Sequence, residues 1–244
     1  MTTHQDLIDN LMCKFNSVQI GKATLFNCDC NDLMAHVPEK HFELSCVDPP
    51  YGLERFKAND GGNSKKITTF GDKDKNWNNI KPTAEYWEEL FRVSKNQIVW
   101  GGNNFELPTS EYFIVWDKGQ MMPSFARCEM AWTNCKVPAK IYAKRSQDLN
   151  RIHPTQKPIK LYEWLLTNYA KAGDTILDTH LGSGSHAIAA NKLGFQFTGI
   201  ELDKDYFNAA CKRIEKALNQ QDMFAPAPSI EVYNQVDMDY ANDL

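Results

Sequence analysis

The 244-residue sequence lacks the features that mark several protein classes. No apolar run approaches the roughly 18 residues that a membrane span needs. The segment MTTHQDLIDN has no basic flank followed by an apolar core, so we expect no signal peptide and a cytoplasmic protein. Of seven cysteines, Cys28 and Cys30 form the only close pair, and their spacing is wrong for zinc. We therefore expect no metal, and reduced, buried thiols.

The remaining composition is ordinary for a globular protein, with 42% hydrophobic and 24% charged residues. The length allows one large α/β domain or two small ones. The net charge is −4, but the charges are unevenly distributed. Residues 55–81 carry seven Lys and Arg against three Asp, and residues 136–160 carry seven against one, whereas no basic residue follows Lys216. Two basic segments in an acidic protein favour a polyanionic partner, although solvated loops have the same composition.

The stretch FELSCVDPPY ends a predicted strand at two prolines, which cannot continue a sheet ladder. Asp48 and Tyr51 should therefore lie at the carboxyl end of a strand, where open α/β sheets bind ligands. The Asp48 carboxylate and the Pro49 carbonyl provide two acceptors for one amino group, and the Tyr51 ring can stack on a flat ring. This pattern suggests an exocyclic amine on a base as the target. Asp-Pro-Pro is also an ordinary way to enter a loop.

Further strands are predicted at 23–27, 97–100 and 112–116, and a hairpin at 129–143 with Pro138 near its bend. Asn31 is a candidate cap for a short helix after the first of these strands, and Asp29 could either neighbour that helix or bind a polar ring. A helix is predicted over 83–95 with Thr83 as its cap. The segment 54–82 mixes basic and aromatic residues and is either a nucleic-acid-binding loop or an inert one.

The second half of the sequence alternates helix and strand. A helix over 159–172 has Pro158 in its first turn and precedes a strand at 175–178. That strand opens into a turn with Gly182 and Gly184, then a helix to Leu193 and a strand at 195–200 that ends at Glu201. Such a βαβ unit binds the nucleoside part of a cofactor. Because the third glycine of a dinucleotide fingerprint is replaced by Ala187, the pattern argues against NAD.

These motifs together resemble the amino-group DNA methyltransferases that use S-adenosylmethionine, in the permuted order with the catalytic motif first. DPPY at 48–51, HPTQKP at 153–158, DTHLGSGS at 178–185 and GIELD at 199–203 follow that family's order over residues 23–215. The resemblance implies an α/β fold: a Rossmann-like, seven-stranded, mostly parallel sheet with an antiparallel hairpin. Asp before Pro-Pro-Tyr is typical of the N6-adenine branch without excluding N4-cytosine. The family usually has Phe where this sequence has His180.

The resemblance implies a role for each matching residue. Asp29 would meet the cofactor adenine, Glu201 its ribose, and Gly182–Ser185 its methionine part. The full predicted cofactor-binding set is Asp29, Asp48, Thr155, Lys157, Asp178, His180, Gly182, Ser183, Gly184, Ser185, Glu201 and Leu202. The predicted catalytic set is Asp48, Pro49, Pro50 and Tyr51, acting on an adenine flipped out of the duplex. The predicted DNA-binding set is Lys65, Lys66, Lys73, Lys75, Lys144, Arg145 and Arg151.

The domain prediction is a single methyltransferase domain over 1–218, with a mobile DNA-binding loop at 54–82, a short target-recognition region at 117–151 and an acidic tail at 219–244. At the start of this tail, QQDMF resembles the pentapeptide that docks bacterial replication proteins on the sliding clamp. Gln220, Met223 and Phe224 would be its anchors, unless they only contact a helix end. A homodimer is also expected to be possible. The alternative functions are N4-cytosine methylation and a DNA-binding module with a vestigial cofactor pocket.

Overall fold

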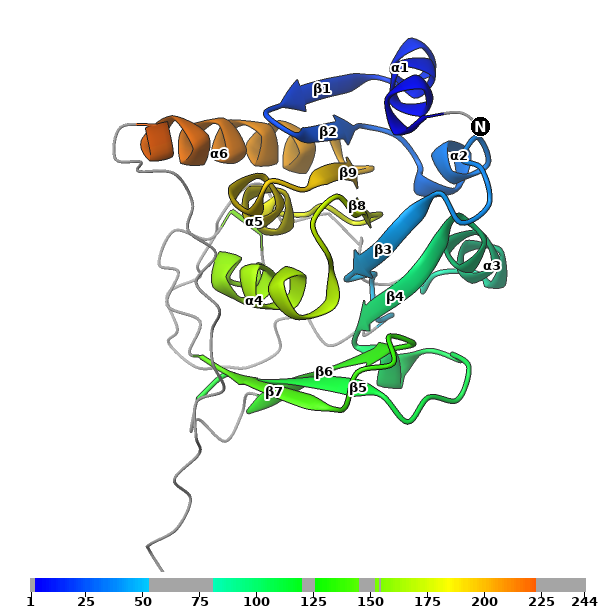
Figure 1. Ribbon diagram of the computed structural model, residues 1–244, viewed down its shortest axis with the longest axis vertical. Helices are drawn as coiled ribbons and strands as arrows, with labels where there is room; N and C mark the ends of the chain where they lie inside the picture. The colour runs from blue at the N-terminus through cyan, green and yellow to red at the C-terminus, as the bar shows by residue number, and fades with distance from the viewer. Residues whose placement is uncertain (1–2, 53–80, 120–125, 145–151, 154, 223–244) are drawn as a thin grey trace, which may run out of the picture.

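The computed structural model describes residues 3–52, 81–119, 126–144, 152–153 and 155–222. In these residues one mixed sheet lies between two layers of helices (Figure 1). The strand order is β1-β2-β9-β8-β3-β4-β6-β5-β7. The strands are β1 (Ser17–Ile20), β2 (Ala23–Phe26), β3 (Phe42–Val47), β4 (Ser94–Trp100), β5 (Phe113–Asp117), β6 (Cys128–Thr133), β7 (Lys140–Ala143), β8 (Thr175–Asp178) and β9 (Gln196–Ile200).

The five central strands, from β2 to β4 in that order, pair in parallel. Their carboxyl ends therefore lie along one edge of the sheet. The strand order reverses between β3 and β8. From β3 the chain continues to β4 on one side, and from β8 it continues to β9 on the other side. A crevice forms at such a point, and it is where doubly wound sheets bind ligands.

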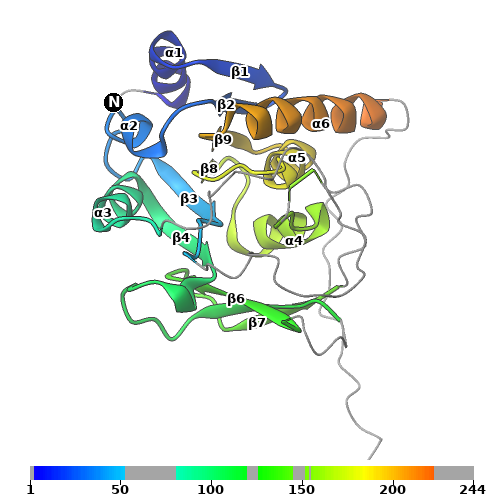
Figure 2. The same ribbon diagram turned by 180° about the vertical axis from the view of Figure 1, so that it is seen from behind.

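Each face of the sheet is covered by helices (Figures 1 and 2). On one face α4, α5 and α6 share a core with the sheet, and on the other face α1, α2 and α3 share a second core. In α1 the apolar residues Leu7, Ile8 and Leu11 recur at helical spacing and are buried. The helices are α1 (His4–Lys14), α2 (Cys30–Met34), α3 (Ala84–Val93), α4 (Ile159–Tyr169), α5 (Ser185–Leu193) and α6 (Lys204–Asp222).

The structure corrects the predicted hairpin at 129–143. The strands β6 and β7 do not pair with each other, because β5 lies between them. The antiparallel pair is β5 with β6, and β7 joins the outer side of β5 in parallel. The number of strands is also different, since the described residues form nine strands where seven were expected. The unpredicted β1 is a four-residue strand with one exposed and two half-buried side chains, a pattern too short for periodicity to reveal.

Two helix starts also differ from the prediction. Asp29, not Asn31, caps α2, since the Asp29 carboxylate accepts the backbone N–H of Asn31 at 2.7 Å. Pro158 is the N-cap of α4 instead of a first-turn residue. Thr83 caps α3 as predicted. An oxygen at the N-cap satisfies a backbone donor that the helix leaves unpaired, and either Asp29 or Asn31 has the side chain to do so.

Two expectations from composition can be compared with the described residues. The cysteines are all free, and Cys46, Cys135 and Cys211 are buried as expected, but Cys13 and Cys128 are exposed. Among the helices of the described ranges, none combines the length and the apolar composition that crossing a bilayer requires.

Candidate active site

A pocket of about 760 Å³ opens at the carboxyl edge of the parallel strands. Residues that follow β2, β3, β8 and β9 line it, among them Asp29, Asp48, Thr179 and Glu201. Segments far apart in the sequence thus meet there because their strands are parallel neighbours in the sheet.

The glycine turn after β8 forms one wall. Gly182 and Gly184 both have left-handed backbone angles, with φ of +51° and +72°. The Gly182 N–H donates to the Glu201 carboxylate at 2.9 Å, and the Asp203 N–H donates to the other Glu201 oxygen at 3.0 Å. The two backbone bonds fix the carboxylate at the end of β9. Burial nevertheless raises the pKa of Glu201 to about 7.

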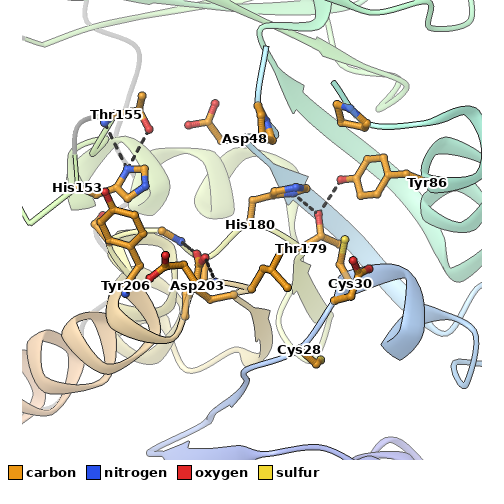
Figure 3. A pocket seen from close by; sticks show the side chains of 18 of the residues that line it. Cys28, Cys30, Asp48, Tyr86, His153, Thr155, Thr179, His180, Asp203 and Tyr206 are labelled. Atoms are coloured by element: carbon orange, nitrogen blue, oxygen red, sulfur yellow. Dashed lines mark hydrogen bonds between the residues drawn. The ribbon is translucent and has the colours of Figure 1, made fainter. Parts of the chain in front are cut away.

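Aromatic rings flank the pocket on two sides (Figure 3). The His180 and Tyr86 rings lie edge to face with their centroids 5.5 Å apart. The Thr179 hydroxyl is hydrogen-bonded to both the Tyr86 hydroxyl and His180 Nδ1. On the opposite side, His153 packs against Tyr206 with ring centroids 4.5 Å apart. Burial lowers the pKa of both histidines to about 4. Both imidazoles are therefore neutral at pH 7 and act as flat polar rings.

Asp48 is held by two side chains. Tyr51 Oη donates to Asp48 Oδ1 at 2.6 Å, and Lys157 Nζ binds Asp48 Oδ2. The Lys157 ammonium also lies 3.3 Å from Glu129 Oε2 on β6, and Glu129 pairs with Lys118. The Lys157 side chain is only 3% exposed, so this ion pair is largely shielded from water. Each Asp48 oxygen keeps a lone pair for a further donor.

Comparison with known proteins places this geometry in context. Residues 99–212 match the family model described as DNA methylase. The type II methyltransferase M2.DpnII of Streptococcus pneumoniae is 29% identical over 139 residues, which cover 57% of this chain and 49% of that protein, so this chain spans about half its length. The type II methyltransferase M2.LlaDCHI of Lactococcus lactis subsp. cremoris is 26% identical over 248 residues, covering 80% of this chain and 90% of the relative.

The chain is thus similar to DNA methylases and to type II methyltransferases over these residues. Solved structures agree at the level of the fold. The M1.HpyAVI complex with S-adenosylmethionine (SAM) superposes with a TM-score of 0.52 at 20% identity, covering 78% of this chain and 99% of that one. The PvuII cytosine-N4-specific DNA methyltransferase superposes with a TM-score of 0.56 at 14% identity, covering 84% and 96%. The fold is thus an α/β methyltransferase-like fold.

Many of the predicted methyltransferase residues meet at the pocket. The lining includes Asp29, Asp48, Pro50, Thr155, Lys157, His180, Gly182, Ser183, Glu201 and Leu202. Asp29 caps α2 and also lines the pocket, and its binding of a polar ring stays a prediction.

Other predicted residues lie behind the lining. Asp178 is 2% exposed and accepts hydrogen bonds from the His180 N–H and from His186 Nδ1, both at 3.0 Å, so it holds the turn in place. Gly184 and Ser185 lie behind the pocket lining, where Gly184 packs against Ile214 and Ser185 accepts a hydrogen bond from Arg213. Pro49 and Tyr51 are likewise not part of the lining.

The predicted DNA-binding residues fall almost entirely outside the described residues. Of these, only Lys144 is described, and its side chain is exposed. The others lie in the ranges that the structure leaves undescribed: Lys65, Lys66, Lys73, Lys75, Arg145 and Arg151. The loop 54–82 is described only at Lys81 and Pro82, which line the pocket. Of the proposed clamp anchors, Gln220 is exposed in α6, and Met223 and Phe224 lie beyond the described residues.

Sequence reasoning missed four groups of this site. The sequence places Tyr86 only within the predicted helix 83–95, and it gives Tyr206 and Cys30 no role at the site, although all three line the pocket. Glu129 was interpreted only as a strand residue, although it is the second anion beside Lys157. An acidic residue inside a mostly apolar strand was the signal that could have identified Glu129, since a buried carboxylate needs a cation.

Proposed function

We propose that this chain is a SAM-dependent DNA methyltransferase that modifies the N6 amine of adenine. The observation that carries the proposal is the meeting of Asp48 with the glycine turn and Glu201 around one pocket. The family match and the two type II relatives support DNA methylation and a role in restriction and modification. Asp in the DPPY motif favours adenine, and the chain order with DPPY before the glycine turn supports a permuted methyltransferase.

The residues that line the pocket fit this cofactor. A Cβ at position 182 would lie 3.8 Å from atoms of the His153 ring. A side chain in place of Gly182 would therefore take up space inside the pocket. Glu201 is an acceptor fixed by two backbone bonds, which suits a ribose diol. Asp29 would accept from the adenine amine, and the neutral His180 ring would offer a flat polar face. Thr155 and Ser183 would complete the part of the pocket next to the methionine.

Asp48 and the Pro49 carbonyl would act on the target amine. SAM supplies a methyl group on a sulfonium, which is already a good leaving group. The chain's own task is to orient the N6 nitrogen, whose lone pair is delocalised into the purine ring. Two acceptors that bind both N–H groups favour a tetrahedral nitrogen and stabilise the positive charge that develops on it. The Tyr51 ring would stack on the flipped base.

The remaining assignments extend this proposal to the whole chain. Residues 1–218 would form one methyltransferase domain, with DNA contacts from loop 54–82 and target recognition from 117–151. Basic residues in these segments would bind phosphates, so DNA affinity should fall steeply with salt. Docking on the sliding clamp through Gln220, Met223 and Phe224 and formation of a homodimer stay predictions.

One assay tests the function and separates it from the alternatives. The full chain is incubated with methyl-labelled SAM and mixed-sequence DNA, and the DNA is then digested to nucleosides. Labelled N6-methyladenine would support the proposal. Labelled N4-methylcytosine would move the chain to the cytosine branch, which the PvuII structure makes the second candidate at the level of the fold. DNA binding without any label in the nucleosides would favour a module with a vestigial pocket.

Cofactor affinity should depend on pH through Glu201. Since burial raises the pKa of Glu201 to about 7, the carboxylate protonates as the pH falls through that value and loses acceptor capacity. We expect the SAM dissociation constant to rise about tenfold between about pH 8 and about pH 6. His153 and His180, with pKa values of about 4, stay neutral over this range. Calorimetric titration at each pH measures the effect.

Glu201→Gln is the control for this prediction. It keeps the shape of the side chain but does not titrate, so its weaker affinity should be the same at both pH values. An equal pH dependence in the variant and the parent would assign the effect to another group.

A further inference from the structure

Lys157 is better placed to act on Asp48 than on the cofactor. Its ammonium binds Asp48 Oδ2, lies 3.3 Å from Glu129 Oε2, and sits 5.2 Å from the centre of the Trp100 ring. These three partners approach from three different elements, namely the end of β3, β6 and β4. The hydrogen bond to Asp48, the ion pair with Glu129 and the contact with the Trp100 ring therefore all hold the ammonium beside the end of β3.

Lys157 is the most buried of the three charged side chains. The Lys157 side chain is 3% exposed, whereas those of Asp48 and Glu129 are 15% and 26% exposed. The cation is therefore more deeply buried than the two carboxylates that it pairs with. A buried cation in this position interacts strongly with both anions, because little water screens it.

We propose that Lys157 is a positioning residue that keeps Asp48 oriented and ionised as the acceptor for the target amine, and that Glu129 tunes it by sharing the same ammonium. This inference rests on the proposed function and adds to it a regulator of the acceptor carboxylate. It also links β6, which lies within the predicted target-recognition region, to the reacting end of β3 through a single ion-pair chain. In this proposal Lys157, which lines the pocket, acts on Asp48 instead of in the predicted cofactor-binding role.

The two neighbours should affect Asp48 in opposite directions. Burial raises the pKa of Asp48, the Lys157 ammonium lowers it, the Glu129 carboxylate raises it, and the hydrogen bond from Tyr51 lowers it. Tyr162 on α4 and Cys46 on β3 also face this group, and burial raises the pKa of both above the physiological range, so they stay neutral. Ionised Asp48 accepts one N–H of the amine beside the Pro49 carbonyl and stabilises the positive charge that develops on the nitrogen, so the methyl-transfer rate should fall on the acid side of its titration.

The experiment is the single-turnover rate of methyl transfer at saturating SAM and DNA, measured from about pH 5 to about pH 9. Lys157→Met removes the cation while keeping the length of the side chain. The acid limb of its rate profile, where the transfer rate falls as the pH is lowered, should move to higher pH by at least about one pH unit. At a given pH on that limb the rate should then be about tenfold lower than in the parent. Glu129→Gln removes the competing anion, and its limb should move to lower pH, with a roughly threefold higher rate on the limb.

A control and a binding measurement separate this effect from a loss of structure. Lys95→Met removes another lysine–carboxylate pair, that with Glu43 on the far end of β3 and β4, and should leave the limb where it is in the parent. If Lys157 acts on Asp48 and not on the cofactor, Lys157→Met should bind SAM within about threefold of the parent, because both anions that the ammonium pairs with are protein carboxylates.

Several outcomes would overturn the proposal. Limbs that move in the same direction in both variants, or not at all, would indicate a purely structural role. A tenfold loss of SAM affinity in Lys157→Met with an unmoved limb would return the lysine to the cofactor. If Lys157→Met does not fold, Glu129→Gln decides alone, and an unmoved limb contradicts the proposal. Absence of methyl transfer by the parent would instead contradict the proposed function.

Discussion

Asp48→Ala is expected to reduce methyl transfer at least about a thousandfold. The Asp48 carboxylate lines the pocket and still has acceptor capacity beyond its bonds to Tyr51 and Lys157. The alanine variant would leave the Pro49 carbonyl as the sole acceptor for the amine, so the nitrogen would lose both its orientation and the nearby negative charge. Single-turnover transfer from labelled SAM to DNA measures the loss.

Cofactor binding by the same variant provides the internal control. Since Glu201 and the glycine turn are held by backbone bonds that do not involve Asp48, SAM affinity should stay within about threefold of the parent. Asp9→Ala is the matched surface control and should leave both properties unchanged, because the hydrogen bond that Asp9 accepts within the described residues comes from Gln5 in the same helix, α1. Transfer retained in Asp48→Ala would refute the assignment of this acid.

Gly101→Ala should lower methyl transfer about a hundredfold through Tyr51. Gly101 follows β4 with a φ of +65°, and a Cβ there would lie 2.4 Å from Tyr51 Cε1 and 2.5 Å from Tyr51 Cζ. Because neither distance is possible, the ring must move. Its 2.6 Å hydrogen bond to Asp48 would then break. The measurement is again single-turnover transfer, together with the midpoint of thermal unfolding.

Gly173→Ala separates the clash from the backbone cost. Gly173 also has a positive φ, +92°, but a Cβ there meets no atom within 4 Å. Both variants should lose about 1 kcal/mol of stability, because alanine is disfavoured in left-handed backbone conformations. Only Gly101→Ala should lose activity beyond that. Similar activity in the two variants would show that Tyr51 tolerates displacement.

The pairing of β5, β6 and β7 illustrates what the sequence could not specify. Their residue ranges were largely predictable from apolar and β-branched runs bounded by turn residues. The partner of each strand was not, because Pro138 lies between β6 and β7 and made a direct hairpin the simplest connection. The structure instead places β5 between them, where Phe113–Asp117 pairs with both neighbours. Local sequence favours a turn but does not determine which edge the next strand joins.

The sequence by itself determined the local backbone of two parts of the site, the acid after β3 and the glycine turn after β8. Two prolines after β3 fix Asp48 at a strand end, and the glycines after β8 require the positive φ angles that are observed there. These are local effects of backbone geometry, so they can be recognised without the fold.

Only the tertiary structure decided which distant side chains contact these two parts of the site. Lys157 lies 109 residues from Asp48, and Tyr86 lies 93 residues from Thr179, yet each pair is in hydrogen-bond contact. Such contacts depend on the order of parallel strands and on burial, which makes an unpaired charge costly and so brings Lys157 between two carboxylates. No local pattern encodes that choice of partners, because it is the packing of the whole sheet that brings them together.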